Sequence, residues 1–184
     1  MCLRNTKETY GAVSKILHWL IAVLVLIMLI AGVSFNYLPK GPFFSLLMFI
    51  HKSTGVTILG LMIFRLLWHW TNPLPRFPLS MPQWQKYAAR SVHFLFYLLL
   101  IAMPITGIVM TLAAGYHVPF WGIANIHWDA IPKYKALSEL MANWHLYLAW
   151  TIAIFIVLHT LAALKHHVID KDNVLKRMWF QKNP

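Results

Sequence analysis

The segment Trp144–His167, WHLYLAWTIAIFIVLHTLAALKHH, carries two histidines in a long apolar run. His145 and His159 are fourteen residues apart, so on a helix the second side chain returns to within ~40° of the first, ~21 Å further along the axis. An imidazole in an apolar helix needs a partner for its ring nitrogens, and a metal or cofactor can provide one. We therefore expect this helix to ligate two stacked haems, with partner histidines supplied by the rest of the chain.

The composition is that of an integral membrane protein. Of the 184 residues, 59% are hydrophobic and only 11% are charged, which leaves too little polar surface for a soluble domain of this size. The net charge of +11 is explained by a basic cytoplasmic membrane face, and we expect no nucleic acid partner. Cys2 is the only cysteine, which excludes a CxxCH motif, so any haem must be held without a covalent link.

Four segments are long enough to cross a bilayer, and the sequence predicts an all-α, four-helix transmembrane bundle formed by a single domain, residues 1–184. The predicted spans are 16–38, 44–70, 91–115 and 141–165. The connection after the second span is rich in proline and is predicted to be a stiff loop. The connection after the third is predicted to lie on the membrane interface, with a short helix after Pro132.

The distribution of cations predicts the orientation. Twelve of the 16 Lys and Arg residues lie on the side that holds both termini, and the other four are Lys40, Lys52, Lys133 and Lys135. Because positive residues favour the cytoplasmic side, we expect a multi-pass protein of the bacterial inner membrane with both termini in the cytoplasm.

Depth in the membrane pairs four histidines. With this orientation His18 lies at the inner depth of His159, and His51 lies at the outer depth of His145. Any one of these histidines alone would more often be a hydrogen-bonded core residue than a ligand. Four of them at two matching depths favour two haem sites. His93 also enters the third span at the inner depth, and it remains a competing ligand.

Two cations in the second span have candidate roles beside these sites. Arg65 follows His51 by fourteen residues and is predicted to pair with a propionate of the inner haem, because an isolated guanidinium at that depth is costly. Lys52 is a candidate for the same role at the outer haem, and the alternative is that it extends to the membrane interface.

The chain resembles the bacterial cytochrome b561 family over almost its whole length. The resemblance rests on the order and spacing of SKILHW (14–19), FIHKSTG (49–55), YLLLIAMPITGIVM (97–110), NWH (143–145) and LHTLAALKHH (158–167). Residue by residue, it implies haem b ligation by His18 with His159 and by His51 with His145, which agrees with the pairing by depth. It further implies that electrons from periplasmic superoxide pass through the two haems to ubiquinone.

Other members of the family are electron-transfer subunits, so the alternative is a subunit that links a partner dehydrogenase or hydrogenase to the quinone pool. Such a subunit would need a protein redox partner, and a homo-oligomer is a further open alternative. Haem content separates both readings from a transporter, for which the spans lack paired carboxylates and inverted repeats.

If the activity implied by the resemblance holds, the substrates need sites of their own. The outer cations Lys52, Lys133 and Lys135 are candidates for steering superoxide, and their alternative is a solvated rim. His166 and His167 are candidates for the quinone and proton site, and their alternative is a basic helix end.

Overall fold

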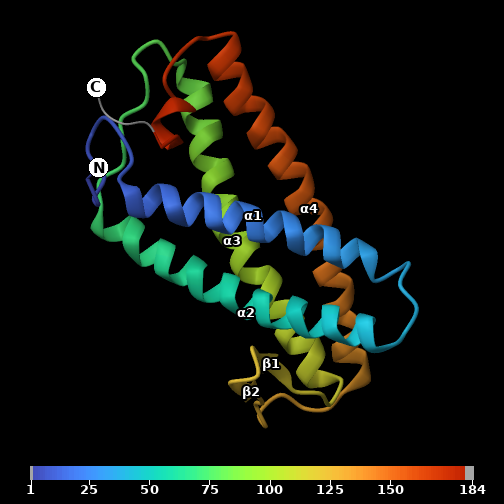
Figure 1. The fold of residues 1–184 in the computed structure, drawn as a ribbon. Helices are drawn as coiled ribbons and strands as arrows, with labels where there is room; N and C mark the ends of the chain where they lie inside the picture. The colour runs from blue at the N-terminus through green and yellow to red at the C-terminus, as the bar shows by residue number, and fades with distance from the viewer. Residues whose placement is uncertain (1, 181–184) are drawn as a thin grey trace.

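The computed structural model describes residues 2–180 and confirms the all-α, four-helix architecture. Within these residues, four helices are long and apolar enough to cross a membrane. These are α1 (Ala12–Ser34), α2 (Pro42–Thr71), α3 (Gln83–Ala113) and α4 (Lys135–Val168). A two-stranded hairpin, β1 (Val118–Phe120) and β2 (Ala124–Ile126), lies between α3 and α4, and a short 3-10 helix, η1 (Lys176–Met178), follows α4 (Figure 1).

The helix bounds differ from the predicted spans at several ends, with a proline near each of them. α1 ends at Ser34 rather than at residue 38, and residues 35–37 form turns before Pro39. α3 begins immediately after Pro82, eight residues before the predicted span. α4 begins at Lys135, so the short helix expected after Pro132 is instead the first turns of α4.

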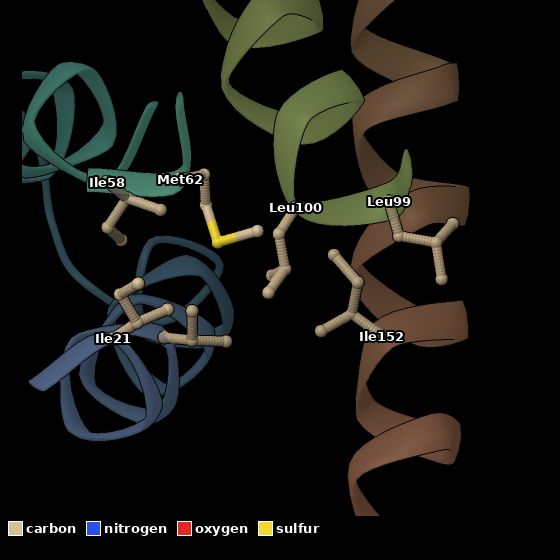
Figure 2. Packing of buried hydrophobic residues seen from close by; sticks show 7 residues of the cluster. Ile21, Ile58, Met62, Leu99, Leu100 and Ile152 are labelled. Carbon is tan, nitrogen blue, oxygen red and sulfur yellow. The ribbon is translucent and has the colours of Figure 1, made fainter. Parts of the chain in front are cut away.

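Each helix packs closely against the next one in sequence, α1 on α2, α2 on α3 and α3 on α4. A hydrophobic cluster of buried residues joins the four helices, and Figure 2 shows how its members pack. It consists of Ile21, Val25, Ile58, Met62, Leu99, Leu100 and Ile152. Ile152 is 1% exposed and stands seven residues from both His145 and His159. The core therefore separates the two depths at which the histidines lie.

The hairpin is fastened to α2, a feature that the sequence did not predict. The Ser53 hydroxyl is fully buried, donates to the Pro119 carbonyl at 3.1 Å and accepts the backbone N–H of Trp121 at 3.1 Å. The Trp121 indole N–H donates to the Thr57 hydroxyl at 2.9 Å. Trp121 and Gly122 both have positive φ, as the central residues of a type I′ turn require. We call this end of the bundle the hairpin end.

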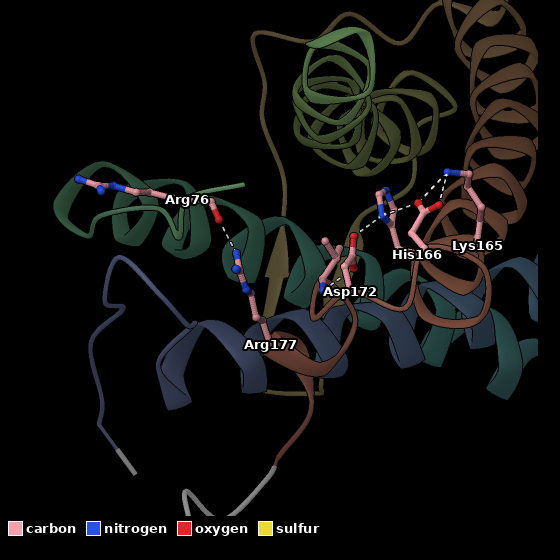
Figure 3. A network of polar contacts seen from close by, with 7 residues as sticks. Arg76, Lys165, His166, Asp172 and Arg177 are labelled. Atoms are coloured by element: carbon pink, nitrogen blue, oxygen red, sulfur yellow. Dashed lines mark hydrogen bonds and ion pairs between the residues drawn. The ribbon is translucent and has the colours of Figure 1, made fainter. Parts of the chain in front are cut away.

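The described parts of both termini lie together at the opposite end, called here the terminal end (Figure 1). Lys15 is buried and donates to the backbone carbonyl of Trp179 at 3.1 Å, and the Trp19 indole donates to that of Met178 at 3.0 Å. Arg177 donates to the Arg76 carbonyl in the proline-rich loop (Figure 3). The segment after α4 therefore returns to α1 and this loop. Lys182, one of the cations counted for orientation, lies outside the described residues.

Candidate cofactor sites

The terminal end brings His18 of α1 and His159 of α4 together. Their ring centres are 6.3 Å apart and the ring planes are inclined by 69°. His93 of α3 approaches the same His159 ring at 5.7 Å, and Phe96 approaches it at 5.5 Å. Three histidines therefore gather at this site. His93 lies close enough to His159 to stay a competing candidate ligand, as the sequence indicated.

The hairpin end brings His51 of α2 and His145 of α4 together. Their ring centres are also 6.3 Å apart, with the planes inclined by 66°. The Nδ1 atom of His51 is buried and has no hydrogen-bond partner among residues 2–180. A buried polar nitrogen without a partner is costly, so this nitrogen needs a hydrogen-bond partner or a ligand.

The donor sets fit a haem at each end. An imidazole nitrogen binds a metal at ~2 Å and the ring centre lies ~1 Å beyond it, so two imidazoles on opposite sides of one metal have centres about 6 Å apart. Both observed separations match this value. On α4, which carries a histidine of each pair, Ile152 is the one fully buried residue.

His145 is oriented for ligation by α3. Its Nδ1 lies 3.0 Å from the Met103 carbonyl and 3.1 Å from the Thr106 hydroxyl oxygen. A carbonyl only accepts, and the Thr106 hydroxyl donates its proton to the same carbonyl at 2.7 Å. The Nδ1–H of His145 is therefore the donor, which leaves the lone pair on Nε2 for a metal.

His18 is held differently. The Arg65 Nη2 atom lies 3.3 Å from His18 Nδ1, and the guanidinium also lies 6.0 Å from the centre of the Tyr97 ring. Because a guanidinium only donates, His18 Nδ1 accepts in this arrangement and Nε2 carries the proton. Metal ligation through Nε2 therefore requires Arg65 to leave Nδ1 for another acceptor.

Of the three cations predicted to steer an anion, Lys52 lies next to a candidate ligand, His51. It is half-buried in a groove of about 260 Å³ lined by Phe44, Ser45, Met48, Phe49, Lys52 and Pro119. Lys135 is exposed and pairs with Glu139 at 3.6 Å. Lys133 is exposed, and its methylene groups lie over Gly115.

His166 and His167 have different surroundings at the end of α4. The His166 side chain is 12% exposed, and its Nδ1 lies 2.7 Å from one carboxylate oxygen of Asp172 and 3.1 Å from one of Asp170 (Figure 3). Lys165 holds Asp170 with its Nζ at 2.6 Å. A carboxylate accepts, so Nδ1–H of His166 is the donor and its ring orientation is fixed. His167 is exposed.

The positioning contacts to His145 were not predicted. Met103 and Thr106 provide the acceptors, and Gly107 provides room, because a Cβ built there would lie 3.1 Å from His145 Cε1. The sequence did offer a signal, since the AMPITG segment (102–107) places a proline, a threonine and a glycine together in a span.

Comparisons with known proteins identify the family of this chain. A family model described as "Prokaryotic cytochrome b561" matches residues 9–181. "Cytochrome b561 homolog 2" of Escherichia coli (strain K12) is 34% identical, covering 97% of this chain and 95% of the relative. "Probable superoxide oxidase CybB" of Yersinia pestis is 32% identical, covering 95% and 98%. "Cytochrome b561 homolog 1" of the same Escherichia coli strain is 32% identical, covering 88% and 92%. The chain belongs to the prokaryotic cytochrome b561 family, whose members are haem b membrane proteins.

Proposed function

We propose that this protein is a dihaem superoxide:ubiquinone oxidoreductase of the bacterial inner membrane, with both termini in the cytoplasm. Two superoxide anions would each give up one electron at the hairpin end, and ubiquinone would take up both electrons and two protons at the terminal end. The observation that carries the proposal is the presence of two histidine pairs, each with ring centres 6.3 Å apart, at opposite ends of one helix. The relative named "Probable superoxide oxidase CybB" supports the choice of donor.

In this proposal His18 and His159 hold one haem b, and His51 and His145 hold the other. Haem held by these four histidines would supply one-electron transfer. The orientation of His145 by Met103 supports Nε2 as its ligating atom. Arg65 would exchange His18 for a propionate, which would free the His18 ring for ligation.

The cations at the hairpin end support superoxide as the donor. Lys52 is adjacent to His51 and lines the groove beside the hairpin, so its charge attracts an anion toward that site. Electrostatic steering of this kind is screened by salt. Lys133 and Lys135 would add to the positive field, and Lys135 contributes less because Glu139 is its neighbour.

The His166–Asp172 pair supports a proton-donating quinone site at the terminal end. Asp172 would fix the orientation of the imidazole, while the other ring nitrogen would exchange a proton with the quinone oxygen. His167, which is exposed, would serve the same site less effectively. His166→Gln should therefore slow quinol formation more than His167→Gln.

The test is to mix the purified, oxidised, quinone-loaded protein with superoxide while recording haem absorbance, oxygen release and quinol. The expected result is rapid haem reduction followed by quinol, with reduction lost in His51→Ala and His145→Ala. Haem that is present but inert to superoxide would refute the proposed donor. That outcome would favour the alternative, an electron-transfer subunit that receives electrons from a partner protein.

A further inference from the structure

A second pair of histidines lies outside the two candidate cofactor sites, at the base of the hairpin. His117 precedes β1 and His127 follows β2, and both side chains are exposed. Val118 is paired with Ile126, so one step further out His117 and His127 face each other across the two chains. Their ring centres are 5.5 Å apart, with the planes inclined by 75°.

From this geometry we propose that His117 and His127 together bind a divalent cation of the Cu²⁺, Ni²⁺ and Zn²⁺ class. Two imidazoles that share one tetrahedral ion have ring centres about 5 Å apart, given nitrogen–metal distances of ~2 Å. Residues directly opposite each other in an antiparallel pair have Cβ atoms ~4.5–5.5 Å apart, which suits both rings to one ion. Small rotations of exposed side chains then complete the fit, and water fills the remaining positions.

The chemistry of the pair selects this class of cation. Imidazole suits zinc, copper and nickel, whereas magnesium and calcium prefer oxygen ligands. A different cluster at the terminal end, formed by His166, Asp170 and Asp172, has donor atoms within 4.8 Å of one another. There, however, Lys165 already occupies Asp170 with its ammonium group at 2.6 Å, so a cation would meet a like charge.

Metal binding at this pair would tie the two strands together. An isolated two-stranded hairpin is only marginally stable, and this one has strands of three residues each. Its attachments to α2 are at Ser53 and Thr57, close to His51 in sequence. The site would thus stiffen the segment that covers the hairpin end, and this conclusion does not depend on the proposed oxidoreductase activity.

The experiment is a titration of the haem-loaded full chain in detergent with Zn²⁺, which has no redox chemistry to disturb the haems. Calorimetry should detect a site that weakens at least about tenfold in His117→Gln and in His127→Gln, because the second ligand acts within the same molecule. Hydrogen exchange at the backbone amides of residues 118–126 should slow on adding Zn²⁺ to the wild type and stay unchanged in the double variant.

The matched control is Asn125→Gln, an exposed change in the same hairpin that removes no imidazole. It should keep both the zinc affinity and the protection by zinc, and the haem spectrum of every variant should match that of the wild type. Equal zinc affinity in the wild type and the double variant would overturn the proposal. The zinc would then bind at another site, and the cluster of His166, Asp170 and Asp172 would be tested next. Failure of the wild type to bind Zn²⁺ would overturn it as well.

Discussion

Gly107 is the position where a single added methyl group most directly tests the site at the hairpin end. A Cβ at residue 107 would lie 3.1 Å from His145 Cε1 and 3.4 Å from its Nδ1. Ordinary van der Waals contact begins near 3.4–4 Å, so the ring would have to withdraw by a few tenths of an ångström. The ring resists this movement because its Nδ1–H is bonded to the Met103 carbonyl at 3.0 Å.

We expect Gly107→Ala to weaken haem binding at the hairpin end while leaving the terminal end unchanged. Overpacking a well-fitted site by one methyl group costs ~1–3 kcal/mol. At 1.4 kcal/mol for each factor of ten, this cost corresponds to a loss of haem affinity of about 5- to 150-fold. Gly107→Val would increase the crowding and should remove that haem altogether, which halves the haem content.

The assay is the ratio of haem to protein together with a redox titration that resolves the two proposed haems. Gly60→Ala is the matched control, because a Cβ at residue 60 of α2 meets no atom within 4 Å. If Gly107→Ala keeps the haem affinity and midpoint potentials of the wild type, as Gly60→Ala should, the reasoning is refuted. Residue 107 would then not need to be glycine to leave room for the His145 ring.

Three further predictions concern charge and pH. Arg65→Leu should lower the midpoint potential of the haem proposed at the terminal end, because a cation close to that haem favours its reduced form. A redox titration in which Arg65→Lys stays closer to wild type would support charge as the cause. Lys52→Gln should slow the reduction of haem by superoxide in stopped-flow measurements and should weaken the dependence of that rate on salt. Lys135→Gln removes a cation that is already paired with Glu139, so it should change the rate far less. Burial raises the pKa of Tyr10 above its ordinary value of 10.0, with Arg65 opposing the shift. The stability that this phenol contributes is therefore present below that ordinary value and is lost as the pH rises above it, and Tyr10→Phe should show a smaller alkaline drop in thermal stability.

The helices and the pairing of the four histidines followed from the sequence for simple physical reasons. A bilayer core needs ~20 apolar residues per helix, so long apolar runs identify spans with little ambiguity. A fourteen-residue interval is close to four helical turns, so His145 and His159 must share a face. The structure places His51 and His18 opposite them with the same 6.3 Å separation, which the depths in the spans had indicated.

The hairpin and the segment after α4 could not be predicted in the same way. Three-residue strands are too short to show an alternating pattern, and β1 contains Pro119, which usually argues against a strand. The positive φ of Trp121 is rare for a bulky residue and has no sequence signal. Lys15 and Trp19 donate to backbone carbonyls of Trp179 and Met178, and such acceptors do not depend on residue type.

The segment Met103–Gly107 of α3 both orients the His145 ring and leaves space for it. Pro104 lies inside α3 and has no N–H, so it cannot donate a helical backbone hydrogen bond. The Met103 carbonyl beside it accepts from both the Thr106 hydroxyl and His145 Nδ1. Because the Thr106 hydroxyl donates to that carbonyl, its oxygen can only accept from the imidazole, and the tautomer of His145 is fixed from two sides. Gly107, one helical turn after Met103, leaves room for the ring so oriented. Among residues 2–180, His18 has no comparable backbone partner and meets the Arg65 guanidinium instead, so in the proposed haem site its orientation would depend on where Arg65 finds its anion. At the hairpin end the protein therefore orients His145 by itself, whereas in the proposed haem sites the orientation of His51 and of His18 would be completed by what binds there.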